Sequence, residues 1–408
     1  MLNFITGGVC AAQGFRAGGI HVGVKTHAAW KKDVALIVSD EDCACAAVYT
    51  KNAVKAAHIH VDKRHLADGK ARAAVINSGN ANACAPMGEE NAERVCAAAG
   101  KALGCRPEDV VVAATGVIGQ TLNVAVIEQG MPELCAAAAH TAAGSDAAAH
   151  AIMTTDTVKK ELAVETVIGG KTVRMGGIAK GSGMIHPNMG TMLCFLTTDC
   201  AISSEMIKSA LLETVQVSFN RISVDGDTST NDTCCVLANG LAGNPVITEK
   251  GPDYDAFVEA LRALCVELAK KMASDGEGAT HLITCTVTGA GSEQSAETVA
   301  KSVIGSALTK AAIFGADANW GRVLCAMGYS KAPFRPEHVD VTFRSAAGEL
   351  LVCKQGEAVD FDEAKAKEVL SQKEVIIAVD LHEGEDSAEC WGCDLTYDYV
   401  KINGDYRT

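Results

Sequence analysis

The sequence predicts an α/β protein with at least two structural units. Short segments rich in β-branched residues, bounded by turn residues, alternate with Ala-rich segments of helical length. At 408 residues the chain is also longer than one ordinary domain. Hydrophobic residues make up 48% and charged residues 21%, which is the composition of an ordinary globular protein.

In the first half of the chain we expect four strands, two helices and a hairpin. The hairpin runs from Leu162 to Gly177, where apolar and polar residues alternate on both sides of Gly169 and Gly170, a pair that suits a tight turn. Short β-branched runs predict strands at 33–38, 54–61, 73–77 and 109–113, and Ala-rich runs predict helices at 91–100 and 132–153.

The second half repeats the mixture of helices and strands. No fixed-period repeat or Pro-rich linker marks a domain boundary, so we place the break where the pattern changes, near Gly289–Ser292. The periodicity predicts helices near 203–219, 253–272, 294–312 and 361–371, and strands near 281–289, 338–344, 349–353 and 374–381.

Charge and composition argue against several classes of function. The net charge is −14, and no run of Lys or Arg forms a footprint for nucleic acid or an anionic membrane. The N-terminus lacks the basic region of a signal peptide, and no apolar stretch is long enough to span a membrane. The 17 cysteines are odd in number and mostly lie singly in apolar surroundings, which indicates reduced thiols and a cytoplasmic location.

Three patterns resemble metal or redox sites, and each has a plainer interpretation. His58 and His60 share one face of a predicted strand, but no carboxylate or thiol is spaced to complete a zinc tetrahedron. The run DGDTSTND at 225–232 begins like a calcium loop and then lacks the required glycine and final glutamate. The Cys-Trp-Gly-Cys run at 390–393 has no second cysteine pair. We therefore expect no metal.

The stretch KGSGMIHPNMGTMLCFLTTD, residues 180–199, carries the strongest chemical signal. A loop of small residues leads into an apolar segment typical of a buried strand, with Thr191 directly after Gly190. A threonine that begins a chain can use its own α-amino group as a base, and that group is partly neutral near physiological pH. Glycine before it leaves the preceding carbonyl accessible and tolerates strained backbone angles. We interpret 190–191 as a self-cleavage junction.

The same stretch resembles the maturation site of the ornithine acetyltransferase family, the ArgJ-type glutamate N-acetyltransferases of arginine biosynthesis. The usual family junction is Ala-Thr-Met-Leu, and this chain has Gly-Thr-Met-Leu; His186 likewise replaces a residue that is usually small. Further matching motifs span essentially the whole chain: GGV near the N-terminus, NSGNANAC at 77–84, ATGVIG at 114–119, MTTDT at 153–157, SFNRISVDGDTSTND at 218–232, DGEGAT at 275–280, FGADANWGRV at 314–323 and WGCDLTYDYVKINGDYRT at 391–408.

The resemblance implies a ping-pong acetyl transfer on Thr191. The Thr191 hydroxyl would attack the acetyl group of N2-acetyl-L-ornithine with its new α-amine as base, and L-glutamate would then take the acetyl group from the enzyme. Thr115 and Gly116 match the pair that stabilises the oxyanion. The matches to substrate contacts, whose groups can meet a carboxylate or an ammonium, are Thr154, Lys180, Thr191, Glu277, Asn403 and Thr408.

The resemblance also implies an architecture and an assembly. Layers of helix, sheet, sheet and helix, similar to N-terminal-nucleophile enzymes but with a distinct topology, would form a core at about 1–289, before a smaller C-terminal α/β domain at about 290–408. Cleavage would give an α chain, 1–190, and a β chain, 191–408, which would pair into a heterotetramer of two α and two β chains. No cofactor is implied, and acetyl-CoA as a second acetyl donor stays open. The motifs without an assigned role are 225–232 and 319–322.

Two other functions remain open. A self-activated aminopeptidase or amidase of similar architecture would pass its acyl group to water, so it would release acetate without glutamate. An uncleaved amino-acid-binding protein would keep an intact chain, and Thr191 would then be only a hydroxyl at a strand edge.

Overall fold

The chain divides into two compact units. The computed structural model describes residues 2–26, 31–186 and 192–405. The second unit includes β11 (Leu282–Ala290), so it begins one strand earlier than the break that the sequence predicts near Gly289–Ser292. The first unit comprises Met1–Gly181, Pro187–Asn220 and Thr228–Leu268, and the second Ser182–His186, Arg221–Asp227 and Ala269–Thr408.

The first unit is built on a nine-stranded mixed sheet. Its strand order is β1-β6-β7-β8-β10-β3-β4-β5, and β2 pairs with β3. The sixteen-residue β3 joins the two halves of the sheet, because its beginning pairs with β2 and β4 and its end pairs with β10. The strands are β1 (Asn3–Ile5), β2 (Phe15–Ile20), β3 (Val34–Tyr49), β4 (Lys70–Asn80), β5 (Val110–Val117), β6 (Lys160–Ile168), β7 (Lys171–Lys180), β8 (Leu193–Thr198) and β10 (Thr233–Ala238).

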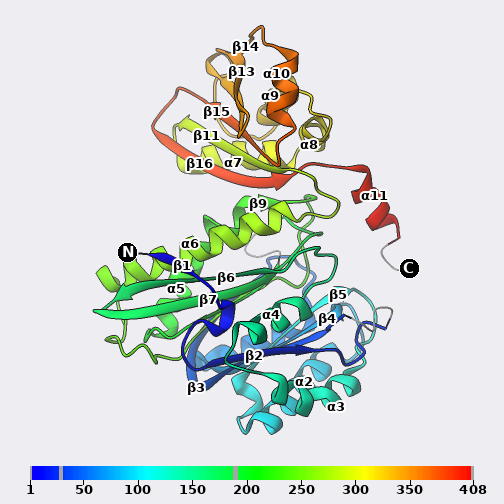
Figure 1. Ribbon diagram of the computed structural model, residues 1–408, viewed down its shortest axis with the longest axis vertical. Helices are drawn as coiled ribbons and strands as arrows, with labels where there is room; N and C mark the ends of the chain where they lie inside the picture. The colour runs from blue at the N-terminus through cyan, green and yellow to red at the C-terminus, as the bar shows by residue number, and fades with distance from the viewer. Residues whose placement is uncertain (1, 27–30, 187–191, 406–408) are drawn as a thin grey trace. The chain divides into compact units, whose positions relative to one another are not determined.

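The two halves of this sheet pack face to face, which confirms the predicted α-β-β-α layering (Figure 1). Ile37 and Ile76, from β3 and β4, share one buried core with Ile178 and Phe195, from β7 and β8. The half-sheets therefore bury their inner faces against each other, and their outer faces need helices to cover them.

Helices cover both outer faces of the first unit. Val95 and Met131 pack against Val75 on the outer face of β3–β5, and a Cβ added at Gly177 on β7 would meet Leu264 of α6. The helices are α1 (Ala57–His65), α2 (Gly88–Leu103), α3 (Val124–Ala137), α4 (Ala142–Ala151), α5 (Ser204–Gln216) and α6 (Pro252–Ser274), the last continuing into the second unit, with short 3-10 helices at Gly8–Cys10, Leu66–Asp68, Pro107–Asp109 and Phe219–Arg221.

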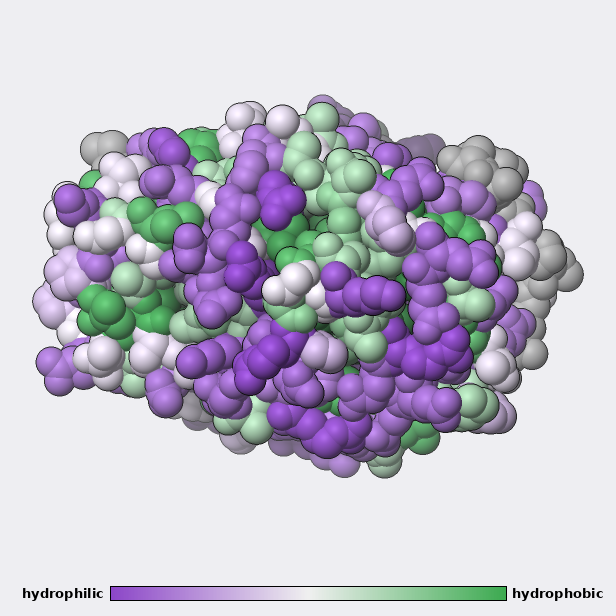
Figure 2. All heavy atoms as spheres, turned by 90° about the horizontal axis from the view of Figure 1, so that it is seen from below, coloured by the Kyte–Doolittle hydropathy of each residue, from purple (hydrophilic) through white to green (hydrophobic). Residues whose placement is uncertain are grey.

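The face of the protein seen in Figure 2 is mostly hydrophilic, with apolar residues scattered over it. On α2 the sequence shows how such a surface arises, because Glu89 and Glu90 are exposed whereas Val95 and Cys96 are buried. This division between a polar and an apolar side is that of an amphipathic helix lying on a sheet. None of the described helices is long and apolar enough to cross a membrane.

The second unit has its own seven-stranded sheet, in the order β14-β13-β12-β15-β11-β16-β9. Three helices share one core with this sheet, as Val299, Met327 and Leu370 do with Phe343 and Ile377. The strands besides β11 are β9 (Ile222–Ser223), β12 (Asp340–Ser345), β13 (Gly348–Lys354), β14 (Glu357–Ala358), β15 (Glu374–Asp380) and β16 (Asp386–Cys393); the helices are α7 (Glu293–Gly305), α8 (Ala307–Phe314), α9 (Trp320–Gly328), α10 (Glu363–Leu370) and α11 (Tyr397–Gly404), with a 3-10 helix at Pro336–His338.

The predicted strand at 54–61 is wrong, because this segment forms α1 (Ala57–His65). Its buried side chains include His58, Asp62 and His65, and a spacing of three to four residues places them on one face of a helix. The β-branched residues up to Val61 favour a strand when taken alone, and the helical spacing is complete only when the residues up to His65 are included.

Two predicted helices are each divided in the structure, whereas the hairpin is confirmed. A new helix begins after Thr141, whose hydroxyl accepts from Gly144 N, and another after Ser306, whose hydroxyl accepts from Thr309 N. These N-caps satisfy free amides and so start α4 and α8 as separate helices. Both glycines of the β6–β7 turn have positive φ, 54° and 74°, as a tight hairpin turn requires.

Candidate active site

Several of the predicted site residues lie at one end of the strands of the first unit. Lys180 is the last residue of β7 and pairs with Leu193, the first residue of β8. Thr115 and Gly116 lie within the last three residues of β5, which extends past the strand that the sequence predicts at 109–113. β8 begins two residues after Thr191, so its first residues follow the predicted junction closely along the chain.

A buried hydrogen bond joins the two halves of the sheet at this edge. Lys180 Nζ donates to Thr115 Oγ1 over 3.2 Å. Only 7% of Lys180 and 9% of Thr115 is exposed. A lysine held in such a position can bind a carboxylate more strongly than a lysine in water, because the low local dielectric strengthens the attraction.

Gly116 is a position that only glycine can occupy. Its φ is +129°, and an added Cβ would lie 2.4 Å from the carbonyl carbon of Gly79 on β4. The close approach of the two strand ends therefore depends on two glycines. It leaves the backbone of Gly116 next to the hydroxyl of Thr115, and a hydroxyl with a neighbouring amide is the type of pair that stabilises an oxyanion.

Asp156 organises the charged groups behind Lys180. Its Oδ1 accepts from Lys160 Nζ at 2.6 Å and from Gly181 N at 2.8 Å, and its Oδ2 accepts from Thr154 N at 3.0 Å. The side chains of Asp156 and Lys160 are fully buried. Burial by itself raises the pKa of the Asp156 carboxyl, but the charges of Lys180 and Lys160 and these hydrogen bonds hold it well below its usual value.

Lys25 is a second lysine at this end of the strands, and no pattern in the sequence indicates it. Its Nζ donates to Met153 O at 2.8 Å, and a Cβ on Gly79 would lie 2.9 Å from Lys25 Cγ. Burial lowers the pKa of Lys25 to about 8, against the charge of Asp33, which raises it. Lys25 thus fixes the residue before Thr154.

The polar run before β10 also belongs to this site. Asn231 Nδ2 donates to Ala81 O at 2.6 Å and to Ala114 O at 2.8 Å, which ties the loop to the ends of β4 and β5. Asp232, the last residue of the run, is 1% exposed. The motif at 225–232 had no assigned role, and an available signal was its unbroken polar run directly before a buried strand.

The other two described candidates, Glu277 and Asn403, meet within the second unit. Asn403 Nδ2, on α11, donates to Glu277 Oε2 over 2.7 Å, and Glu277 N donates to Ser182 O over 2.9 Å. Glu277 is 6% exposed, and an added Cβ at Gly183 would lie 2.4 Å from its carboxyl group. A carboxylate fixed in this way can meet an ammonium group.

Three of the predicted site residues, Gly190, Thr191 and Thr408, lie outside the described residues. The first unit brings together Thr115, Gly116, Thr154 and Lys180, and the second brings together Glu277 and Asn403.

The patterns at His58 and at 390–393 are structural. His58 is buried on α1 with Nε2 3.3 Å from Thr233 Oγ1, and burial lowers its pKa to about 4. All 17 thiols are free, and burial raises the pKa of Cys390 to about 12 and of Cys393 to about 11. Among the described residues, no group of three or more His, Cys, Asp or Glu side chains is arranged to hold a metal ion.

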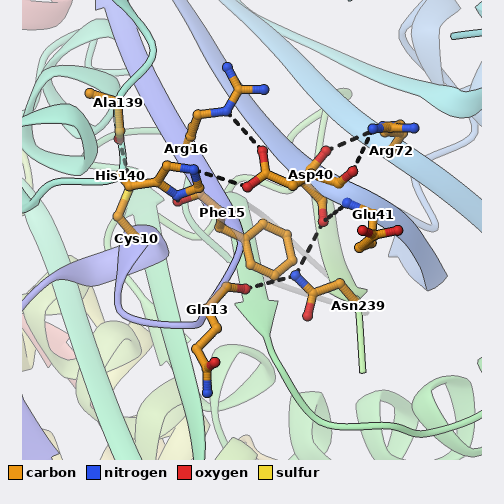
Figure 3. Close-up of polar contacts among 11 residues, drawn as sticks. Cys10, Gln13, Phe15, Arg16, Asp40, Glu41, Arg72, Ala139, His140 and Asn239 are labelled. Atoms are coloured by element: carbon orange, nitrogen blue, oxygen red, sulfur yellow. Dashed lines mark hydrogen bonds and ion pairs between the residues drawn. The ribbon is translucent and has the colours of Figure 1, made fainter. Parts of the chain in front are cut away.

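A second polar cluster, drawn in Figure 3, lies near the starts of β2 and β4, at the other end of the first sheet. Arg16 and His140 point toward the carboxylate of Asp40, with closest distances of 3.1 and 3.0 Å. Arg72 donates to the carbonyl of Asp40 at 2.5 Å, and Asn239 donates to the carbonyl of Gln13 at 2.8 Å. The ion-paired side chains are a third to a half exposed, so this cluster ties strand ends together in contact with water.

A layered α/β fold with a buried cation and a hydroxyl–amide pair at its strand ends is that of an enzyme able to handle an acyl group. The sequence model of the ArgJ family matches residues 16–408. The arginine biosynthesis bifunctional protein ArgJ of Symbiobacterium thermophilum is 52% identical over the whole of both chains. The protein of that name from Bacillus subtilis is 46% identical over 99% of this chain and 97% of its own. This chain therefore belongs to the ArgJ family.

A solved structure is also similar. The crystal structure of ornithine acetyltransferase complexed with ornithine from Mycobacterium tuberculosis shows 36% sequence identity. It covers 46% of this chain and 100% of that chain, with a TM-score of 0.43.

Proposed function

We propose that this protein transfers the acetyl group of N2-acetyl-L-ornithine to L-glutamate, and that the acetyl group is carried by Thr191 after the chain cleaves itself between Gly190 and Thr191. Membership of the ArgJ family makes the chain an acetyl-transferring enzyme of arginine biosynthesis. The observation that best supports the detailed mechanism is the buried contact of Lys180 with Thr115, beside the strand that follows Thr191.

Each half-reaction has the same chemical needs. The Thr191 hydroxyl attacks the acetyl carbonyl while the α-amine takes its proton, and the carbonyl oxygen becomes an oxyanion. The hydroxyl of Thr115 and the amide of Gly116 stabilise that oxyanion, each by about 3 kcal/mol. Ornithine leaves, and the α-amine of glutamate attacks the acetyl-threonine in the reverse sense.

The charged residues suit an amino-acid substrate. Lys180 binds the α-carboxylate, and Glu277, fixed by Asn403, binds an ammonium group. Thr154, held by Asp156 through its backbone, and Thr408 orient the remaining polar groups. Ornithine and glutamate share their α-carbon groups, so the contact of Lys180 with the α-carboxylate serves both half-reactions.

The assembly and the second donor follow from the same proposal. The products of cleavage are an α chain of residues 1–190 and a β chain of residues 191–408, which pair into a heterotetramer of two α and two β chains in the cytoplasm. Relatives in this family are named bifunctional, which supports acetyl-CoA as a second acetyl donor to glutamate. No other cofactor is needed for the transfer.

The test is an acetyl-transfer assay on the purified protein with N-acetylornithine, with and without glutamate. We expect ornithine and N-acetylglutamate in equal amounts when glutamate is present, and no sustained turnover without it. Sustained release of acetate in the absence of glutamate would instead identify an amidase. No ornithine under either condition would leave an amino-acid-binding protein as the interpretation.

A Thr191→Ala variant is the matched control for this assay, because it removes the hydroxyl with a small change in volume. We expect it to show no transfer. Transfer by this variant at the wild-type rate would contradict the role of Thr191.

A further inference from the structure

Glu277 lies in a loop that the sheet of the second unit does not hold in place. The loop, residues 275–281, connects α6 to β11, and it lies beyond the last residue pair between β11 and β16. Asn403, the partner of Glu277, is reached from β16 through a second irregular segment, 394–396, before α11 begins. Because both segments belong to the second unit, the meeting of the two side chains depends on how these segments contact each other.

Asp394 joins the two segments. Its Oδ1 accepts from the backbone nitrogens of Thr280 and His281, at 2.8 and 3.0 Å, and its Oδ2 lies 2.8 Å from His281 Nδ1 and accepts from the hydroxyl of Thr280. The side chain of Asp394 is fully buried. Burial by itself raises the pKa of its carboxyl group, but the hydrogen bonds from His281 and Thr280 hold that pKa below its usual value. Both oxygens of a buried carboxylate are thus bound by one loop.

Thr396 and two glycines hold the same loop against the start of α11. Thr396 Oγ1 donates to the carbonyl of Gly278 at 2.7 Å, and Thr396 is 7% exposed. Gly278 follows Glu277 and has a φ of +70°, and an added Cβ would lie 2.7 Å from a backbone nitrogen of α11. On the other side of Glu277, a Cβ added at Gly276 would lie 2.6 Å from Cys393 Sγ. Both neighbours of Glu277 therefore pack closely against the segment that leads into α11.

We propose that Asp394 and Thr396 are positioning residues, which fix the loop carrying Glu277 onto the segment before α11. The Glu277 carboxylate is thereby kept where Asn403 and an ammonium group of the substrate meet it. This inference rests on the proposed function, because it takes Glu277 to be a substrate contact. Binding groups must be held to within about 0.5 Å, and hydrogen-bonded side chains behind them supply that precision.

The effect of these residues belongs to substrate binding and not to the chemical step. In N2-acetyl-L-ornithine the only ammonium group is at the end of the side chain, away from the acetyl group. Its contact with Glu277 is therefore as strong before the attack on the acetyl carbonyl as during it. Loss of such a contact raises the half-saturating concentration of the substrate and leaves the limiting rate unchanged.

Acetylation of the enzyme by N-acetylornithine without glutamate separates binding from chemistry, because a single half-reaction is followed. The half-saturating concentration and the limiting rate are measured for Thr396→Val, which keeps the shape of the side chain and removes the hydroxyl. We expect the half-saturating concentration to rise roughly 3- to 10-fold, the contribution of one hydrogen bond, with little change in the limiting rate. Thr396→Ser keeps the donor and should restore the wild-type value.

A double substitution shows whether Thr396 acts through Glu277. Glu277→Gln alone should raise the half-saturating concentration roughly 10- to 100-fold, as for loss of a hydrogen bond to a charged group. Thr396→Val should add little in the Glu277→Gln background, whereas independent effects would multiply. The matched control is Thr288→Val, which removes a hydroxyl bound to Val379 O at 3.3 Å near the far end of β11 and should leave binding unchanged.

Hydrogen exchange in the wild-type protein tests the contacts of Asp394, and it does not depend on how a variant folds. Loop amides without a stable acceptor exchange rapidly. We expect the amides of Thr280 and His281 to be protected like those of β11, because both donate to a buried carboxylate.

Three results would overturn the proposal: rapid exchange of these two amides, an unchanged half-saturating concentration in Thr396→Val, or a shift of full size in the Glu277→Gln background. A wild-type protein that N-acetylornithine does not acetylate would overturn the proposed function instead, and the exchange measurement would still test the contacts of Asp394.

Discussion

The two ends of the first sheet carry the same types of charged residues in opposite surroundings. At one end, Asp156 and Lys160 form an ion pair with both side chains fully buried. At the other, the side chains of Arg16 and Asp40 pair at 3.1 Å while 33% and 42% exposed (Figure 3). Exposed pairs contribute little, whereas a buried charge that loses its partner is costly. The fold does not need buried charges at the end beside β8 for its stability, which indicates that these charges serve the function of the protein.

Replacing Asp156 should have the largest effect on stability. Asp156→Asn would remove the negative charge of Asp156 from beside the buried cation of Lys160, and would weaken the acceptor for Gly181 N. We expect the free energy of unfolding to fall by about 3–5 kcal/mol, measured by urea denaturation. A loss below about 1 kcal/mol would mean that this end is no more demanding than the exposed one.

Replacing Thr115 tests chemistry at the same end with a smaller expected effect on the fold. Thr115→Val keeps the shape of the side chain and removes the hydroxyl, so we expect kcat/KM for acetyl transfer to fall by roughly 10²- to 10³-fold, as for loss of one oxyanion donor. Thr115→Ser keeps the hydroxyl and is the control. If Thr115→Ser lost as much activity as Thr115→Val, packing and not the hydroxyl would be responsible.

The two buried aspartates should give opposite pH dependences of stability. The folded-state pKa of Asp232 lies above its unfolded-state pKa. As pH rises from the unfolded-state pKa towards the folded-state pKa, Asp232 therefore lowers the free energy of unfolding, by up to about 1.4 kcal/mol per pH unit. The pKa of Asp156 is lowered, so its stabilisation is lost as pH falls.

Urea denaturation of Asp232→Asn and the wild type across pH measures this difference. We expect the variant to gain stability relative to the wild type as pH rises above the usual aspartate pKa. A variant that instead loses stability relative to the wild type with rising pH would show that Asp232 is a paired, stabilising carboxylate.

Replacing Asp40 should have the smallest effect. Asp40→Asn removes the exposed ion pairs with Arg16 and His140, and we expect a change of about 0–1 kcal/mol in the free energy of unfolding. Cleavage and acetyl transfer should stay at wild-type rates, since this cluster lies at the opposite end of the strands. A loss of activity in this variant would remove the distinction between the two ends.

Local pattern in the sequence predicts much of this fold but not its closest contacts. The β6–β7 hairpin follows from two glycines between alternating segments, a signal contained in neighbouring residues. The segment 54–61 taken alone favours a strand, because its helical spacing is complete only when the residues up to His65 are included.

The site residues likewise divide into those that a sequence motif indicates and those that only the structure reveals. Thr115, Gly116 and Lys180 were named from motif resemblance, and the structure brings them to one edge. The partners Asp156 and Asn231 lie in motifs whose roles no local rule supplies, because their contacts join residues far apart in the chain. Lys25 had no signal at all, since a buried lysine looks like a surface lysine in sequence.

The most direct measurement is the intact mass of the wild-type protein and its fragments, before and after addition of N-acetylornithine without glutamate. We expect two fragments, of which the one beginning TMLCF becomes heavier by one acetyl group and returns to its first mass when glutamate is added. For Thr191→Ala we expect a single uncut chain. A single uncut wild-type chain, or an acetyl group carried by the other fragment, would contradict the proposed function.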